Sequence, residues 1–234
     1  MRASDRAYAT LLDEIQSGAL PPGTVLAEAE QAARLGVSRT PAREAIVRLV
    51  ADGLAAQQSP RVTVVTDFDA ADIRSLFEVR RALEESTARL AARRCDPAVF
   101  AELARAFAAA HPERADDAAV DAYYALIARF DRALDATVDN AYFTGALRTI
   151  RTHLVRARRL ARDNRARLRA SVEEHRLIAE AIANRDPDLA AHATHVHLHN
   201  ALTSILAAID ASVDTDAAGD DATGDSQQHT KGTP

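Results

Sequence analysis

The chain has 234 residues, 47% of them hydrophobic, so it is long enough to bury the core of one or two domains. Its net charge of −5 argues against nonspecific polyanion binding by the whole surface, and its single cysteine, Cys95, excludes an internal disulfide. The sequence has no run of eighteen apolar residues and no charged-then-apolar leader, so we expect a cytoplasmic protein without a membrane span.

Residues 1–66 are expected to form one small domain. Apolar residues at helical spacing predict a first helix, and GALPPG at 18–23 stops it. A second short helix is expected over 28–34, and a third one follows Gly36 and ends at Gly53. The segment LAAQQSPRVTVVTDF then predicts two short strands around a turn at Ser59-Pro60. Three helices followed by a small hairpin are typical of a winged helix-turn-helix.

The third helix of this domain begins in the segment GVSRTPAREAIVRL, residues 36–49. Ser38 or Thr40 can cap a helix that starts near Pro41, because proline tolerates the first helical turn. Apolar residues then recur at spacings of three and four, which predicts one buried stripe made of Ala42, Ala45, Ile46 and Leu49. The arginines of the segment are therefore left on other faces of the helix.

A helix-turn-helix places the start of its second helix in the DNA major groove, where Arg bonds guanine and Ser or Thr reaches phosphates or base edges. Arg61, beside the hairpin turn, can reach a phosphate or the minor groove. The predicted DNA contacts are Ser38, Arg39, Thr40, Arg43, Arg48 and Arg61. A merely solvated arginine-bearing helix is the alternative, but the turn before it and the hairpin after it favour DNA binding.

The segment PGTVLAEAEQAARLGVSRTPAREAIVRLVADGL, residues 22–54, resembles the N-terminal domain of GntR-family bacterial transcription regulators. The Pro-Gly turn, the LGVSRTP core, the Arg-Glu-Ala run and the closing Asp-Gly carry the resemblance. It implies that Arg39, Thr40 and Arg43 read double-stranded operator DNA. Two positions differ from the family pattern: Gln31 replaces a usually apolar residue, and the hairpin tip is SPR where glycine is common.

Residues 69–212 have a helical pattern throughout, so the fold is expected to be mainly α, with a helical-bundle domain following the winged helix. Its breaks predict six helices and fall at Asp96-Pro97, His111-Pro112, Asn140, Asp163-Asn164 and Asp186-Pro187. Residues 213–234 are polar, lack periodicity and carry five aspartates against one lysine. We expect them to form a disordered acidic tail.

Three polar side chains fall on otherwise apolar helix faces: Asp131, His175 and His197. A buried carboxylate needs a partner, since burying it alone is costly. One aspartate and two neutral imidazoles are a plausible ligand set for zinc, nickel or manganese, with open positions for water or a small carboxylate. The alternative is a hydrogen-bonded Asp–His pair and a second histidine that is satisfied in the core.

The segments DIRSLFEVRRALEESTARLAA, RFDRAL and EEHRLIAEAIANRDPDLAAHATHVHLHN resemble the FadR-type ligand-binding domain, FCD, of the same family, in a six-helix, VanR-like form. The resemblance implies a small organic-acid effector and a metal held by an aspartate and three histidines, with His175 and His197 at two of the histidine positions. Where the family has Asp-x-x-Phe-His, this chain has Ile127 and Asp131. The site therefore resembles a reduced set of three ligands.

Arg80 is the candidate for binding an effector carboxylate through a bidentate fork, and a helix salt bridge to Glu84 is the alternative. The predicted effector-binding residues are Arg80, Asp131, His175 and His197. A second histidine group, His192, His195 and His199, shares another face of the last helix, where it could bind metal or form a solvated or interfacial face. The seven arginines within 156–169 favour a solvated helix end, with extra phosphate contact as the alternative.

These patterns predict a transcription regulator rather than an enzyme, which binds operator DNA as a homodimer and responds to a small carboxylate. Two other functions stay open. The helical domain could catalyse metal-assisted hydrolysis with Asp131, His175 and His197. Alternatively, the pocket could be vestigial and the protein a constitutive DNA binder.

Overall fold

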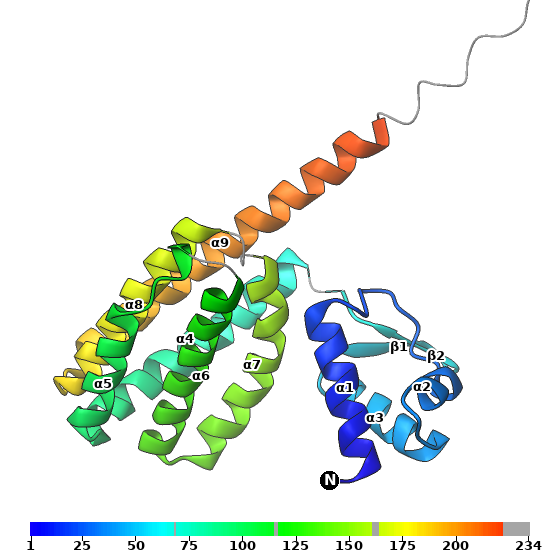
Figure 1. Cartoon of the computed structure of the whole chain (residues 1–234), viewed down its shortest axis with the longest axis horizontal. Helices are drawn as coiled ribbons and strands as arrows, with labels where there is room; N and C mark the ends of the chain where they lie inside the picture. Colours follow the sequence, from blue (N-terminus) through cyan, green and yellow to red (C-terminus); the bar gives the residue numbers. More distant parts are fainter. Residues whose placement is uncertain (68, 115–116, 161–163, 222–234) are drawn as a thin grey trace, which may run out of the picture.

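The computed structural model describes residues 1–67, 69–114, 117–160 and 164–221, which form two domains (Figure 1). In the N-terminal domain, two long helices and one short helix precede a two-stranded sheet. Its elements are α1 (Ala3–Ser17), α2 (Glu28–Arg34), α3 (Arg39–Ala51), β1 (Ala55–Ser59) and β2 (Val62–Val65). This order confirms the predicted winged helix-turn-helix.

Apolar stripes hold the N-terminal domain together. The buried residues of α1, Ala7, Leu11 and Ile15, share one core with Ala45, Ile46 and Leu49 of α3. Gly53, with φ of 74°, turns the chain out of α3 toward β1, a conformation that glycine adopts without steric cost. Strands β1 and β2 pair antiparallel, with Ala55 opposite Val65. The sheet therefore fixes the hairpin beside the end of α3.

The second domain is helical in all its described elements. They are α4 (Ala70–Arg94), α5 (Pro97–Ala108), the short 3-10 helix η1 (Pro112–Arg114), α6 (Asp117–Val138), α7 (Ala141–Leu160), α8 (Arg165–Ala183) and α9 (Pro187–Asp221). Polar residues fix the helix starts as the sequence suggests. Asp69 forms a capping box with Asp72, Asp96 caps α5 ahead of Pro97, and Asn164 accepts from the backbone N–H of Arg167.

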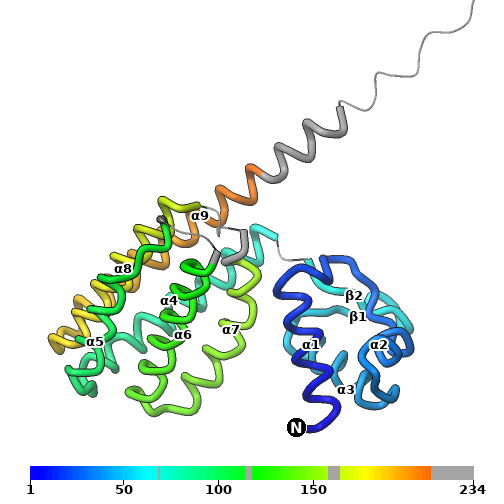
Figure 2. Tube along the Cα trace, in the orientation of Figure 1, coloured from blue at the N-terminus to red at the C-terminus, as the bar shows by residue number. Residues whose placement is uncertain are grey.

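Two apolar clusters organise this helical domain. In the larger one, the rings of Phe100, Phe107 and Phe130 meet edge to face between α5 and α6. The smaller one joins α4, α7 and α9 through residues that include Phe77, Leu154 and Leu198. The second cluster fixes α7 on the side of the domain that faces α1, as the chain trace shows (Figure 2).

Helix α9 continues to Asp221, so it extends into the segment from residue 213 that we expected to form a disordered tail. The segment 213–221 lacks proline and has one glycine, so a helix that is already formed can propagate through it. Residues 222–234 lie outside the described residues. None of the helices in the described ranges is both long and apolar enough to cross a membrane.

Candidate functional site

The candidate DNA-binding surface lies at the start of α3. Ser38, Arg39 and Thr40 are all exposed there, and Arg43 is exposed one turn later. Ser38 occupies the N-cap position with extended backbone, but its side chain makes no capping hydrogen bond. The helix therefore starts where the sequence suggests, although the expected side-chain cap is absent from Ser38. These side chains place hydrogen-bond donors on the exposed side of the helix N-terminus, where they can contact a phosphate or a base edge.

The guanidinium of Arg43 has only a weak partner within the domain. Its Nε lies 3.7 Å from a carboxylate oxygen of Glu28, and both side chains are about half exposed or more. Ion pairs of this kind contribute little, so Arg43 can exchange Glu28 for DNA at small cost. Arg61 is exposed at the turn between β1 and β2, which leaves it at the tip of the hairpin.

Arg48 lies apart from the other predicted DNA contacts on α3. Its Nη1 lies 2.9 Å from Asp5 Oδ1, and its guanidinium sits 4.0 Å from the ring centroid of Tyr8. Both partners are on α1, and nine residues of helix rotate Arg48 about half a turn away from Arg39. The cation–π contact directs Arg48 along the side of the domain, so its contact with DNA stays a prediction.

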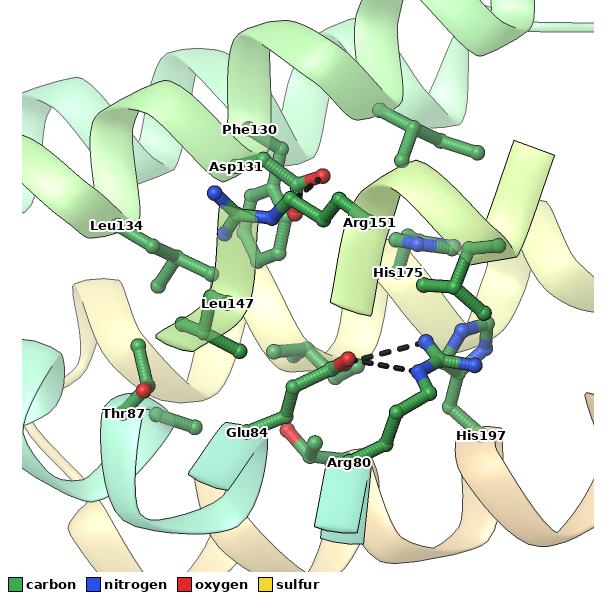
Figure 3. A pocket seen from close by; sticks show the side chains of 15 residues that line it. Arg80, Glu84, Thr87, Phe130, Asp131, Leu134, Leu147, Arg151, His175 and His197 are labelled. Carbon is green, nitrogen blue, oxygen red and sulfur yellow. Dashed lines mark hydrogen bonds and ion pairs between the residues drawn. The ribbon is translucent and has the colours of Figure 1, made fainter. Parts of the chain in front are cut away.

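The candidate effector site is a pair of adjoining cavities between α4, α6, α7, α8 and α9, of about 30 and 60 Å³. Both cavities are lined by Arg80, Ile127, Leu154, His175 and His197. All four residues predicted for the effector line the first cavity, where Figure 3 shows them around one space. The helices that carry them are far apart in sequence, so only the fold brings these side chains together.

Arg80 is nearly fully buried, with 5% of its side chain exposed. Its Nε donates to Glu84 at 2.8 Å, which is the helix salt bridge considered as the alternative role. The guanidinium also lies 4.5 Å from the ring centroid of Phe77 and points toward His197 in Figure 3. A buried guanidinium has donors in a fixed fork, so it can bind Glu84 and still face the cavity.

Asp131 lies at the other end of the first cavity, paired with an arginine of α7. Its Oδ2 is 3.4 Å from Nε of Arg151. The same guanidinium also binds Asp135, one turn along α6, at 2.6 Å. The Asp131 side chain is 23% exposed, so it is less buried than the sequence suggests, and its charge is balanced by a guanidinium.

His197 belongs to a buried polar network between α8 and α9. Its Nδ1 lies 2.7 Å from Glu174 Oε2, and the other oxygen accepts from Asn200. Arg167 donates two hydrogen bonds to the same carboxylate, one to each oxygen. Burial alone would raise the pKa of Glu174, but the hydrogen bonds from His197 and Arg167 outweigh it and lower that pKa to about 2. Burial lowers the pKa of His197, so a neutral imidazole donates to an ionised carboxylate.

His175 is buried beside His197, with ring centroids 4.3 Å apart. Its Nδ1 lies 2.8 Å from the backbone oxygen of Ser171, which orients the ring with Nδ1–H as the donor. The hydroxyl of Tyr123 lies 3.2 Å from that nitrogen and donates to the Ser171 hydroxyl at 2.7 Å. Hydroxyl groups therefore surround the histidine on the side of the second cavity.

The three-ligand metal set is not assembled. In the described part of the chain, no group of three His, Cys, Asp or Glu side chains is arranged to hold a metal ion. The two imidazoles are neighbours, but Asp131 is held by Arg151 instead of turning toward them. A cation close to this guanidinium would be repelled, so the donors present do not fit a bound metal.

The second histidine group is a surface feature of α9. His192, His195 and His199 are exposed, and His195 lies 2.8 Å from Glu85 of α4. These side chains are also outside any group of three that could bind metal among the described residues. The solvated face considered in the sequence is the arrangement observed.

Several site residues escaped sequence reasoning. Three of them are Arg151, Arg167 and Glu174. Each has exposed charged residues nearby in the sequence, such as Arg169 and Glu173, so the local composition did not mark these three as site residues. Arg156 and Arg167 belong to the arginine run at 156–169, yet both bond to protein groups. The run's Arg162 lies outside the described residues.

Comparison with known protein families gives two matches. Residues 3–65 match the family described as bacterial regulatory proteins, gntR family, and residues 75–200 match the FCD domain. A probable D-xylose utilization operon transcriptional repressor from Paenarthrobacter nicotinovorans is 32% identical over 185 residues, covering 79% of this chain and 80% of that protein. An HTH-type transcriptional regulator in an unstable DNA locus of Streptomyces ambofaciens is 30% identical over 192 residues, covering 82% of this chain and 80% of that protein.

Solved structures share the fold. The Escherichia coli protein McbR/YncC superposes with a TM-score of 0.71 at 20% identity, covering 88% of this chain and 97% of that one. A GntR-type regulator from Rhodococcus sp. RHA1 superposes with a TM-score of 0.67 at 24% identity, covering 87% of this chain and 97% of that one. At these identities the likeness concerns the arrangement of helices and strands.

Proposed function

The chain belongs to the gntR family of bacterial regulatory proteins and carries an FCD domain, and on that premise we propose that a small organic acid bound in the helical domain controls its affinity for operator DNA. DNA binding by the winged helix is the activity of the family. The relatives are transcriptional regulators, a class without enzymatic activity, so the hydrolase alternative is set aside.

The charge of the second cavity is the observation that carries the effector proposal. Among its described lining residues are two arginines, Arg80 and Arg167, and no acidic residue. Each guanidinium is also paired with a carboxylate, Arg80 with Glu84 and Arg167 with Glu174. An arginine has five N–H donors, so those that face the cavity can still bind an incoming carboxylate. The buried hydroxyl oxygen of Ser204, which lines the same cavity, finds no hydrogen-bond partner among the residues that the structure describes. An acid carrying a hydroxyl group would supply that partner.

The size of the cavities narrows the class of acid. One water molecule occupies roughly 10–15 Å³ of cavity volume, so the two cavities, of about 30 and 60 Å³, hold only a few water-sized groups. Volumes of this size suit an acid of few carbon atoms, such as L-lactate. An acid of five or six carbon atoms, or a long aliphatic acid, would require the lining side chains and helices to move apart.

We further propose that this effector binds without a metal ion. The pairing of Asp131 with Arg151 supports it, because the guanidinium already provides the positive charge that a metal would bring to the carboxylate. An effector carboxylate then competes with Asp131 for Arg151. His175 and His197 serve as hydrogen-bonding groups in this arrangement.

We propose a homodimer as the DNA-binding form. Winged helices of regulators reach two half-sites one helical turn apart when two copies are related by a two-fold axis. The cytoplasm is where such a protein meets its operator. This part of the proposal rests on the family and on the geometry of DNA.

Calorimetry with small acids tests the effector proposal. The name of the Paenarthrobacter relative suggests sugar-derived acids, so the probes are D-xylonate, D-gluconate, L-lactate and citrate. We expect at least one to bind chelator-treated protein, and Arg80→Leu to abolish binding. A matched control is Arg129→Leu, which removes an exposed arginine paired with Glu102 on the outside of the bundle. If none of the four acids binds, the effector proposal is wrong and constitutive DNA binding is favoured.

A further inference from the structure

Helix α7 bonds directly to the winged helix-turn-helix. The side-chain amide of Gln16, on α1, donates to the backbone oxygen of Thr152 at 3.0 Å. The Nε2 of His153 donates to the backbone oxygen of Asp52, at the end of α3, at 2.8 Å. Burial lowers the pKa of His153, so the neutral ring donates this bond. The imidazole also lies against Gly53, about 3.5 Å from where a Cβ atom would stand.

A third contact joins α7 to the end of the hairpin. Arg156 donates to the backbone oxygen of Thr66 at 2.6 Å and reaches its hydroxyl at 3.3 Å. The Thr66 hydroxyl in turn donates to the backbone oxygen of Gly53 at 2.9 Å. His153 and Arg156 therefore hold the end of the DNA-recognition helix and the end of the wing from one helix.

The opposite face of α7 lines the effector cavity. Leu147, Arg151 and Leu154 follow one another at spacings of four and three, and all three line the first cavity. With 3.6 residues per turn, these positions lie roughly opposite His153 and Arg156. Figure 1 shows α7 between the other helices and the N-terminal domain. One helix thus contacts the cavity on one side and the DNA-binding domain on the other.

The packing of α7 makes it move as a unit. Ile150 and Leu154 are buried with Phe77 of α4 and Leu198 of α9 in one apolar cluster. Close-packed side chains transmit a displacement instead of absorbing it. A change at Arg151 therefore reaches His153, half a turn along the same helix.

We propose that α7 transmits occupancy of the cavity to the winged helix through the exchange of Arg151 between Asp131 and a bound acid. This inference rests on the proposed function, because it assigns the route by which the same cavity acts. When the acid draws Nε of Arg151 from Asp131, the guanidinium turns about the hydrogen bonds that its Nη atoms keep to Asp135. Helix α7 then shifts and changes how His153 and Arg156 hold Asp52 and Thr66. The orientation of α3 relative to the helical domain then changes, which alters DNA affinity.

A double-mutant cycle tests this route without any ligand. Asp131→Asn removes the charge that competes for Arg151, and His153→Ala with Arg156→Ala removes two bonds to the winged helix. Dissociation constants are measured by fluorescence anisotropy on a duplex that the wild-type protein selects from a random-sequence pool. Glu102→Gln is the matched control, since it neutralises the carboxylate partner of Arg129, an arginine of α6, at an exposed site.

We expect Asp131→Asn to change the dissociation constant by roughly 2- to 30-fold in the wild-type background, the range found for coupling mutations. The same substitution should have a much smaller effect once His153 and Arg156 are both alanine, because only the bond from Gln16 to Thr152 then remains of the three contacts described above. Glu102→Gln should have no effect in either background. Equal changes in both backgrounds would overturn the proposal, because the two sites would then be independent. An absent effect in the wild-type background would overturn it as well.

Two further measurements keep the cycle interpretable. Circular dichroism melting shows that each variant is folded, and His153→Gln retains an N–H donor for Asp52, so it should restore coupling that His153→Ala loses. The cycle uses no acid, so it can succeed when the calorimetric screen finds no effector. An acid that binds while the cycle shows additivity would leave the proposed function intact and remove α7 as the route.

Discussion

The Nε of Arg151 lies 3.4 Å from Oδ2 of Asp131, with the guanidinium on α7 and the carboxylate on α6. This contact balances the charge of Asp131, and it ties the cavity wall to the helix that contacts the DNA-binding domain. Both of our proposals depend on it: the binding of an acid without metal, and the transmission of that binding to the winged helix.

Removing metal should leave the protein unchanged. Because Arg151 is the partner of Asp131, we expect treatment with a chelator to alter neither the melting temperature nor the calorimetric binding of an acid. Mass spectrometry of untagged protein should find substoichiometric zinc, nickel and manganese. Near-stoichiometric metal that disappears in the His175→Ala/His197→Ala variant would contradict this expectation.

Arg43→Ala should weaken specific DNA binding by about 1–3 kcal/mol and relax the base preference at one position, if Arg43 reads a base. Arg48→Ala is the matched control on the same helix, since Arg48 pairs with Asp5 and lies over Tyr8. It should leave base preference unchanged and lower stability slightly. Competition binding with single-base variants of the selected duplex measures both. Unchanged specificity in Arg43→Ala would remove that residue from base reading.

Glu174→Ala should destabilise the helical domain strongly. The substitution leaves Arg167 without its buried carboxylate partner, and breaking such a pair costs about 3–5 kcal/mol. Glu173→Ala, one residue earlier, removes an exposed carboxylate and should change the free energy of unfolding by about 0.5 kcal/mol or less. Urea unfolding followed by circular dichroism compares the two. If both substitutions lowered the free energy of unfolding by a similarly small amount, the polar network around Glu174 would contribute little to stability.

The same carboxylate should make stability depend on pH under acid conditions. The pKa of Glu174 falls from its usual 4.5 to about 2 in the folded protein. Above about pH 4.5 the carboxyl is ionised in both states and its stabilisation is complete; as pH falls toward 2 the unfolded state takes up a proton first, so the stabilisation is lost. The loss of stability caused by Glu174→Gln should therefore shrink over this window. A difference that stays constant with pH would contradict the assignment.

Most of the helices and strands could be predicted from local patterns in the sequence. Helix starts at Asp69, Asp96 and Asn164 depend on side chains next to the backbone groups they cap, so their positions can be read from neighbouring residues. The end of α9 could not be read in this way. The acidic composition after residue 212 suggests disorder, whereas α9 extends to Asp221.

The candidate site was predictable only in part. The buried positions of His175 and His197 follow from the apolar faces around them, whereas the salt bridge of Arg80 to Glu84 follows from their spacing of four residues on one helix. Their partners come from other helices: Glu174 of α8 binds His197 of α9, and Arg151 of α7 binds Asp131 of α6. Such pairs depend on packing between distant segments, which a periodic pattern does not encode.

We propose that an acid bound in the helical domain changes DNA affinity without a metal ion. The most direct measurement is fluorescence anisotropy of the selected duplex with chelator-treated protein, in the absence and presence of D-xylonate, D-gluconate, L-lactate or citrate. We predict that at least one acid shifts the dissociation constant by roughly 5- to 150-fold, the usual range for allosteric coupling, and that Arg80→Leu abolishes the shift. An unchanged dissociation constant with all four acids, or a shift that requires added metal, would contradict the claim.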